Sequence, residues 1–165
     1  VISQEADIGI FAGQTESPDV NAYRYAFDEL ILVVPINHPI AANESVRFAA
    51  ALELDFVCVS KASSNYAFLQ EISQKLGRSP NIRIHAHTFD AVMNLVAEGV
   101  GIALVPRSVA VEAILANRVA QVSLRESWAT RKLTLITKAG IQLSTFVESV
   151  AESLMTDPIV MSTRG

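Results

Sequence analysis

The segment from Thr88 to Pro106, TFDAVMNLVAEGVGIALVP, combines the pattern of a helix with that of the buried strand after it. Four apolar residues of the segment share one face of a helix, at the spacing i, i+3, i+4 and i+7: Phe89, Val92, Met93 and Val96. Thr88 can cap the start of this helix, and Gly99 supplies the left-handed residue that ends it. The run 102–105 predicts a strand. A helix packed against a buried strand is the repeating unit of an α/β fold.

Apolar strands and helical windows alternate along the rest of the chain. Short runs rich in Val, Ile and Leu predict further strands at 7–11, 30–34, 56–59, 82–86, 119–124 and 133–137. Helical spacing predicts helices at 65–76 and 109–116, and the capping-box spacing of Thr145 and Glu148 predicts the start of a last helix. Its inward face is expected to carry five apolar residues: Phe146, Val147, Val150, Ala151 and Leu154. The alternation is typical of a parallel sheet with right-handed crossovers.

The composition favours a well-packed α/β chain and argues against several functions. With 165 residues, of which 50% are apolar and 18% charged, the chain can form one core or two small lobes, and disorder is excluded. A formal net charge of −4 argues against a sequence-independent grip on nucleic acid. No run reaches the roughly 18 apolar residues that cross a bilayer. The start of the sequence has no signal pattern, so the protein is predicted to be cytoplasmic, with no membrane partner.

Motifs of the common catalytic classes are absent from the sequence. It contains no Gly-x-Ser-x-Gly elbow, no phosphate-binding loop, no His-Glu-x-x-His and no cysteine pair. The single cysteine, Cys58, lies in an apolar run and is predicted to be a buried thiol. We therefore predict no catalytic residues, no cofactor and no enzymatic activity. An enzyme on the same fold is an alternative that fold analogy does not exclude.

Two other motifs that suggest ligands have simpler explanations. Gly99 and Gly101 follow a helix and enter a strand, the reverse of a dinucleotide-binding loop, so they predict a helix stop followed by close packing. His85 and His87 could bind a metal ion together with Asp90, but an arginine on the same predicted face opposes a metal. A solvated face or a lobe edge is predicted there instead, and no metal site.

The strongest candidate site is the polar stretch SKASSN at 60–65, between a predicted strand and a predicted helix. In open α/β sheets, ligands bind beyond the carboxyl ends of strands, where helix N-termini present free N–H groups and a partial positive charge. Thr88 and Phe89 repeat this arrangement after the next strand. An anion is the natural ligand of such a site. The alternative interpretation is that these residues are ordinary helix caps.

Three segments resemble the LysR-type bacterial transcription regulators in order and spacing. Residues 6–10 (ADIGI) resemble the "aDiGi" strand of that family. Residues 32–41 (LVVPINHPIA) resemble its "lvvp..HPLA" segment, with Ile40 for the usual Leu. Residues 95–106 (LVAEGVGIALVP) resemble its "lVaaGlGialLP" segment. On these three segments in register, the chain is identified as a member of the family.

The resemblance implies a two-lobed α/β fold like that of type II periplasmic binding proteins, in which each lobe holds a mostly parallel sheet flanked by helices. Residues 36–124 are expected to form lobe II, and residues 1–35 with 125–165 an incomplete lobe I. By the same analogy, the sequence lacks the winged helix-turn-helix, the linker helix, and the first strand and helix of lobe I. The hinge residues, where the chain crosses between lobes, are expected to be Pro35, Leu124 and Ser127.

The resemblance also implies the function, which is to sense a small-molecule effector held between the lobes. The effector-binding residues carried over by position are Ile10, Phe11, Ser60, Ser63, Ser64, Asn65, Tyr66, Thr88 and Phe89. The effector is expected to carry a carboxylate. The sensing domains are expected to pair as a homo-oligomer, a dimer that becomes a tetramer in the full-length protein, and to reach DNA only through the absent helix-turn-helix. The alternative is a solute-binding protein of a transport system, and the sequence upstream of Val1 would discriminate between the two.

Overall fold

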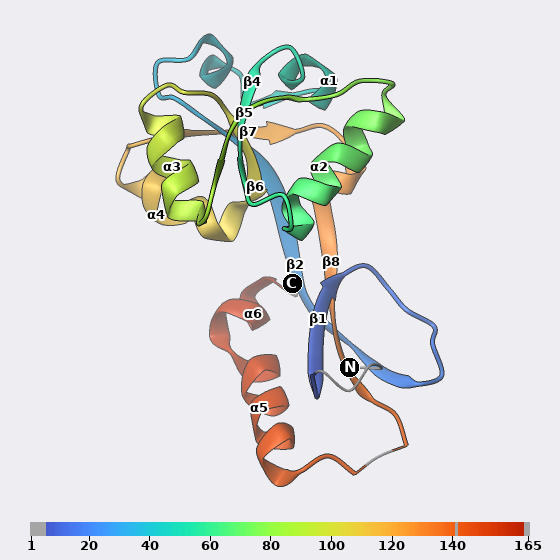
Figure 1. The fold of residues 1–165 in the computed structure, drawn as a ribbon. Coiled ribbons are helices and arrows are strands. Elements are labelled where there is room, and N and C mark those ends of the chain that lie inside the picture. Colours follow the sequence, from blue (N-terminus) through green and yellow to red (C-terminus); the bar gives the residue numbers. More distant parts are fainter. Residues whose placement is uncertain (1–5, 141, 164–165) are drawn as a thin grey trace. The chain divides into compact units, whose positions relative to one another are not determined.

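The computed structural model describes residues 6–140 and 142–163 and divides the chain into two compact units (Figure 1). Unit 2 is the continuous segment Glu29–Ala129. Unit 1 consists of the described residues up to Asp28 and from Thr130 onward. The chain therefore passes between the units twice.

The sheet of unit 2 is built around the second half of one long strand. Its strands are β2 (Val20–Val34, of which 29–34 belong to unit 2), β3 (Ser45–Val46), β4 (Asp55–Val59), β5 (Asn81–Ala86), β6 (Ala103–Pro106) and β7 (Ala120–Leu124). β2 pairs with β6 and with β7, antiparallel to both, and β7 pairs with β3 in parallel. β4 pairs with β5 in parallel, and a bridge between Phe56 and Ile102 joins this pair to the residue before β6.

These pairings differ in one respect from the mostly parallel sheets that we expected. Parallel neighbours occur where a helix crosses over, between β4 and β5 and at the bridge beside β6. A helix also connects β6 to β7, but β2 pairs with both of them and is antiparallel to both. β2 enters unit 2 directly as a continuous strand, without a crossover helix, so its connection does not impose the parallel direction.

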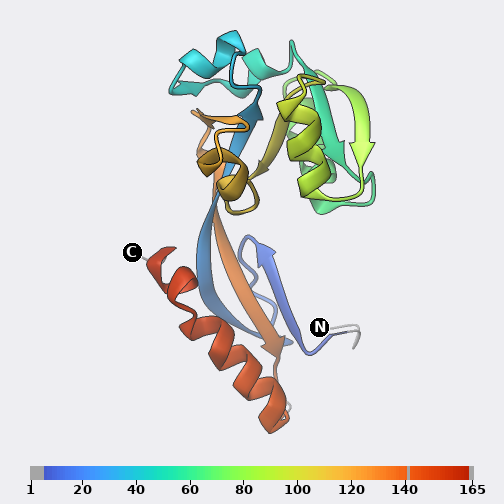
Figure 2. The same ribbon diagram turned by 90° about the vertical axis from the view of Figure 1, so that its left-hand side faces the viewer.

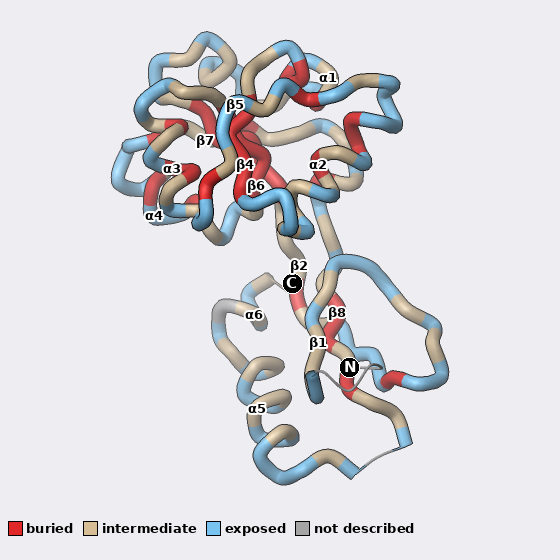
Figure 3. The backbone as a smooth tube through the Cα atoms, viewed as in Figure 1, coloured by how far each residue is buried: buried red, intermediate tan, exposed pale blue. Residues whose placement is uncertain are grey.

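Helices cover both faces of the unit 2 sheet (Figures 1 and 2). They are α1 (Phe48–Ala51), α2 (Ser64–Lys75), α3 (Phe89–Ala97) and α4 (Arg107–Leu115), together with the 3-10 turns η1 (Pro39–Ala42) and η2 (Ser127–Ala129). Phe48 of α1 and Leu69 of α2 belong to one buried core, and Met93 of α3 and Ala113 of α4 belong to a second. Alternate residues of β2 contribute to the two cores, Leu30, Leu32 and Val34 to the first and Ile31 and Val33 to the second. Figure 3 shows the buried backbone concentrated in the strands of this unit.

Two glycines form the junction between α3 and β6. Gly99 follows the helix with a φ of 77°, in the left-handed region. At Gly101 an added Cβ would lie 2.6 Å from the carbonyl oxygen of Asp55, so glycine allows the chain to approach β4 closely. The prediction of a helix stop followed by close packing is therefore confirmed.

Unit 1, as far as the structure describes it, contains three strands and two helices. Its strands are β1 (Ile8–Ala12), the first half of β2, and β8 (Thr130–Lys138), and its helices are α5 (Thr145–Thr156) and α6 (Pro158–Thr163). β8 lies between β1 and β2 in the sheet and is antiparallel to β1, with Ile10 opposite Leu135. Here again the pairing differs from the expected mostly parallel sheet, because β8 returns from unit 2 in the direction opposite to β1.

The start of α5 differs from the predicted capping box. Ser144, and not Thr145, is the N-cap, and its Oγ accepts a hydrogen bond from the backbone N–H of Val147 at 3.3 Å. Phe146, which we expected to face inward, is 77% exposed. A half-buried stripe is formed instead by Val147, Val150, Ala151 and Leu154. Phe146 precedes this stripe by one residue and is turned about 100° away from it.

The three expected hinge residues lie inside unit 2. Pro35 directly follows β2, Leu124 ends β7, and Ser127 begins η2. The chain passes between the units at 28–29, within β2, and at 129–130, where β8 begins. β2 runs unbroken through the first passage, and the proline that ends the strand comes several residues later.

Candidate functional site

Two helix N-termini lie at the same edge of the unit 2 sheet. β4 and β5 are parallel neighbours, and their last residues, Val59 and Ala86, are partners in the ladder. A short loop leads from β4 into α2, and two residues lead from β5 into α3. Each helix is preceded by an extended capping residue, Ser63 or Thr88. Unpaired N–H groups and the positive ends of two helix dipoles therefore converge at one edge.

The loop before α2 is organised by hydrogen bonds to serine oxygens. The carbonyl oxygen of Ser60 accepts a hydrogen bond from the N–H of Ser63 at 2.9 Å, and Ser60 Oγ accepts one from Ala62 N at 3.3 Å. Ser63 Oγ accepts a hydrogen bond from Tyr66 N at 3.1 Å. The hydroxyl of Ser63 is thus used as a helix cap, the simpler of the two interpretations of the sequence.

Thr88 caps α3 in the same way, since its Oγ1 accepts a hydrogen bond from Ala91 N at 3.2 Å. Ser64 and Asn65, the first two residues of α2, differ from these caps. In the described part of the chain, neither of their side chains has a hydrogen-bond partner. Their backbone N–H groups come before that of Tyr66, the one that Ser63 caps, so the cap leaves them free. Exposed Lys61 adds a positive charge to this loop, so α2 offers donors and positive potential without a competing acid in its first turn.

Tyr66 is held against the neighbouring strand. Its ring meets the ring of His85 edge to face, with centroids 4.8 Å apart, and its hydroxyl accepts a hydrogen bond from Gln70 Nε2 at 3.0 Å. His85 Nδ1 lies 2.9 Å from the carbonyl oxygen of Val59. His87 lies beyond the end of β5 and is exposed. Among the described residues, no group of three or more His, Cys, Asp or Glu side chains could hold a metal ion.

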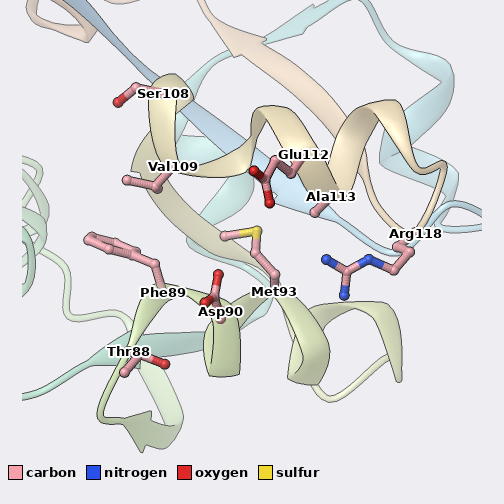
Figure 4. Close-up of a pocket in the computed structure, with 9 residues that line it drawn as sticks. All are labelled: Thr88, Phe89, Asp90, Met93, Ser108, Val109, Glu112, Ala113 and Arg118. Carbon is pink, nitrogen blue, oxygen red and sulfur yellow. The ribbon is translucent and has the colours of Figure 1, made fainter.

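Phe89 and Thr88 also line a cavity of about 350 Å³ between α3 and α4 (Figure 4). Its other lining residues are Asp90, Met93, Ser108, Val109, Glu112, Ala113 and Arg118. Figure 4 shows Asp90 and Glu112 projecting from the two helices toward the space between them. This wall was not predicted from the sequence, because its side chains come from two helices whose packing no local motif reveals. A periodic polar position on the predicted helix 109–116 is the only signal that could have suggested Glu112.

A second cavity, of about 330 Å³, lies within unit 1. It is lined by Gln14, Thr15, Glu16, Ala22, Tyr23, Arg24, Phe27, Lys132, Leu133 and Thr134. Ile10 and Phe11, the expected site residues of this unit, lie on β1 and do not line it. Ile10 is exposed and Phe11 is half-buried. The polar residues just after β1, Gln14 and Thr15, are therefore the nearer candidates for a ligand in this cavity.

Unit 2 is thus a layered α/β module, with helices on both sheet faces and helix N-termini at the carboxyl ends of two parallel strands (Figure 1). The chain belongs to the family described as the LysR substrate binding domain, whose profile matches residues 1–157. This match confirms the resemblance found in the sequence. None of the helices that the structure describes is long and apolar enough to cross a membrane.

Curated relatives of the chain are transcriptional regulators. The Hca operon transcriptional activator HcaR of Escherichia coli (strain K12) is 33% identical over 110 residues, which cover 62% of this chain and 35% of that protein. The HTH-type transcriptional regulator CysL of Bacillus subtilis (strain 168) is 22% identical over 132 residues, which cover 80% of this chain and 44% of that protein. The chain therefore spans less than half the length of either relative. Because the relatives are transcriptional regulators, the alternative of a solute-binding protein is not favoured.

Solved structures with the same fold are regulatory domains. The Synechocystis PCC6803 CcmR regulatory domain in complex with 2-PG matches with a TM-score of 0.79 at 20% identity, over 93% of this chain and 74% of that chain. The effector binding domain of QuiR in complex with shikimate matches with a TM-score of 0.74 at 19% identity, over 93% of this chain and 72% of that chain. The expected α/β fold of the periplasmic-binding-protein type is thereby confirmed.

Proposed function

We propose that this chain is the effector-sensing domain of a LysR-type transcription regulator and that it binds a small metabolite carrying a carboxylate at the α2 and α3 edge of unit 2. The observation that carries the proposal is the convergence of two capped helix N-termini at the ends of neighbouring parallel strands. The proposed contact residues on this edge are Ser60, Ser63, Ser64, Asn65, Tyr66, Thr88 and Phe89. Ile10 and Phe11 of unit 1 are proposed as further contacts on the family resemblance alone.

The two helix ends have different roles in this proposal. The end of α2 has no acidic residue in its first turn and has Lys61 in the preceding loop, so it suits the carboxylate. The end of α3 carries Asp90 in its first turn, which opposes an anion. Phe89 at that end, with Tyr66, then provides the apolar wall for the body of the ligand. Two domains of the same fold hold small ligands, 2-PG and shikimate, and shikimate is itself a carboxylate.

Binding would regulate transcription by shifting an equilibrium between arrangements of the sensing domains. A ligand shifts such an equilibrium only as far as it binds one arrangement better than the other. In this proposal the domain is not an enzyme, acts in the cytoplasm, pairs as a dimer that forms a tetramer in the full-length protein, and reaches DNA through a separate helix-turn-helix. The acidic net charge of −4 supports this division of labour, because phosphate contact depends on Lys and Arg.

A matched pair of serine variants tests the proposed site. Ser64→Ala removes a hydroxyl with no structural partner, and its loss should weaken a bound carboxylate roughly ten- to hundredfold while thermal stability is kept. Ser63→Ala removes the cap and should cost about 1 kcal/mol of folding free energy. Calorimetric titration of shikimate, succinate and citrate, with thermal melting of each variant, measures both effects.

Ser153→Ala, on the exposed face of α5, is the control and should change neither quantity. If Ser64→Ala binds a carboxylate as tightly as the parent protein does, the anion is held elsewhere. A panel in which no carboxylate binds at millimolar concentration would argue against this ligand class altogether.

A further inference from the structure

His85 contacts the candidate effector loop from outside that loop. It lies on β5, opposite Cys58 of β4, while the loop begins after Val59 at the end of β4. The ring nitrogen Nδ1 is 2.9 Å from the carbonyl oxygen of Val59. A carbonyl oxygen can only accept, so Nδ1 carries the hydrogen and the neutral ring is the Nδ1–H tautomer. This assignment of the proton follows from the bonded partner alone.

The contacts of His85 complete a closed cycle around the loop. From Val59 the chain continues to Ser60, whose carbonyl oxygen accepts from Ser63 N at 2.9 Å. Ser63 Oγ accepts from Tyr66 N at 3.1 Å. The Tyr66 ring packs edge to face on His85 at 4.8 Å, and His85 returns to Val59 through Nδ1–H. Four of the five members belong to one segment, and His85 is the member whose side chain joins both ends of this segment to β5.

Tyr66 is fixed at both ends of its side chain. Its ring rests against His85, and its hydroxyl accepts from Gln70 Nε2, one helical turn further along α2, at 3.0 Å. A Tyr ring that is fixed before binding loses little rotamer freedom when a ligand packs on it. The contacts made by His85 therefore order the apolar wall as well as the turn before the helix.

We propose that His85 is a positioning residue, which holds the loop from Ser60 to Tyr66 in the conformation that receives the effector. The binding role of the loop rests on the proposed function. The ordering of the loop by His85 does not. Without His85, the loop retains its local serine bonds, and Val59 stays paired with Ala86, but Tyr66 loses its contact with β5. The ligand would then have to order the loop as it binds, which should lower affinity roughly three- to tenfold.

Two substitutions separate the two contacts of His85. His85→Asn keeps an N–H near the position of Nδ1 and removes the ring, so it should retain the bond to Val59 and lose the packing on Tyr66. His85→Phe keeps a ring for Tyr66 and removes the donor. Ile84→Ala, an exposed change on the same strand, is the matched control. The two variants change the side chain in different ways, one in volume and the other in polarity. If one of them fails to fold, the other still tests the proposal.

The first measurements need no ligand. Nitrogen NMR of the parent protein should show the neutral His85 ring in the Nδ1–H form, and the N–H groups of Ser63 and Tyr66 should exchange slowly with solvent. His85→Phe should speed exchange at both N–H groups, and His85→Asn should speed it less, while exchange in the second half of α2 stays unchanged. An Nε2–H ring, or exchange that neither variant alters, would overturn the positioning role whatever the binding results are.

Binding of shikimate, succinate and citrate to the same variants then connects order to function. A three- to tenfold loss of affinity for the carboxylate that binds, larger in His85→Phe than in His85→Asn and absent in Ile84→Ala, supports the proposal. Faster exchange with unchanged affinity would show that the loop is held by His85 but does not receive the ligand. That result would overturn the binding role and assign the failure to the proposed site, not to the contacts of His85.

Discussion

The same strand, β2, is used differently in the two units. In unit 2 its residues 30–34 are completely buried, because α1 and α2 cover one face of the sheet and α3 and α4 cover the other. In unit 1, Val20 and Ala26 are the buried residues of the first half of the strand, and no residue of α5 that the structure describes is buried. Burial thus depends on how many layers cover a strand, and the apolar content of each half follows from that.

The difference predicts where the folding free energy is concentrated. Stabilisation by apolar burial scales with the area removed from water, at about 25 cal/mol per Å². The two continuous cores of unit 2 remove most of this area, whereas the α5 stripe in unit 1 is only half-buried. Core substitutions in unit 2 should therefore have far larger effects than substitutions of the same residue type on α5.

Two phenylalanines test this contrast most strongly. Phe48 is 1% exposed and packs edge to face on Trp128 at 5.4 Å, whereas Phe146 is 77% exposed. Phe48→Ala should lower the free energy of unfolding by about 3–5 kcal/mol, and Phe146→Ala should change it by less than about 0.5 kcal/mol. Urea denaturation followed by circular dichroism measures both values. Similar losses for the two variants would mean that α5 is covered in solution by a partner chain, and the contrast between the units would fail.

Adjacent acidic residues at the division between the units give the next largest contrast. Asp28 pairs with Arg131 in unit 1, where the side chains are 10% and 20% exposed. Glu29 pairs with Arg107 in unit 2 at 3.0 Å, where the side chains are 35% and 50% exposed. Asp28→Ala leaves a largely buried guanidinium unpaired and should cost about 3 kcal/mol, whereas Glu29→Ala should cost less than about 1 kcal/mol.

The double variant Asp28→Leu with Arg131→Met provides the control for this prediction. Replacing both charges by apolar side chains removes the unpaired charge, so most of the stability lost in Asp28→Ala should return. Equilibrium unfolding in guanidinium chloride compares the three proteins with the parent. If Asp28→Ala and Glu29→Ala lower the free energy of unfolding equally, burial does not determine what the two ion pairs contribute to stability.

The sequence predicted the fold best where a residue's role is local. Thr88 and Gly99 bound α3 as predicted, because capping and left-handed termination depend on neighbouring residues only. The strand at 30–34 was visible because burial on both faces requires a continuous apolar run. Residues 20–29 were missed, because this half of β2 mixes aromatic, charged and small residues and shows no regular apolar pattern.

The candidate site was predictable only in part, for the same physical reason. The serines at 60–64 stood out because polar residues between a strand and a helix are recognisable in the sequence. His85 was considered only as a metal ligand, since its contact with Tyr66 depends on the register between β4 and β5, which places distant residues side by side. The choice of pairing partner leaves no local trace in a strand's sequence, so the direction of β2 against β6 and β7 was also missed.

Cys58 gives the smallest effect and tests how dry the unit 2 core is. Burial raises the pKa of its thiol from an ordinary value of 9.0 to about 12. Between these two values the folded protein keeps a proton that the unfolded chain has lost, so the stabilising contribution of the thiol is complete below pH 9 and falls as the pH rises toward 12.

Between pH 9 and 10, the parent protein should therefore lose about 1 kcal/mol of unfolding free energy relative to Cys58→Ala, which has no thiol to ionise. Denaturant titrations of both proteins at the two pH values measure this difference, and comparing the two proteins cancels the titration of every other group. In the same core, a maleimide at pH 8 should modify the thiol only as fast as the protein opens, because the reactive species is the thiolate. Rapid modification of the folded protein, or parallel pH dependence in the two proteins, would mean that water reaches β4 and that the core of unit 2 is not closed on both faces.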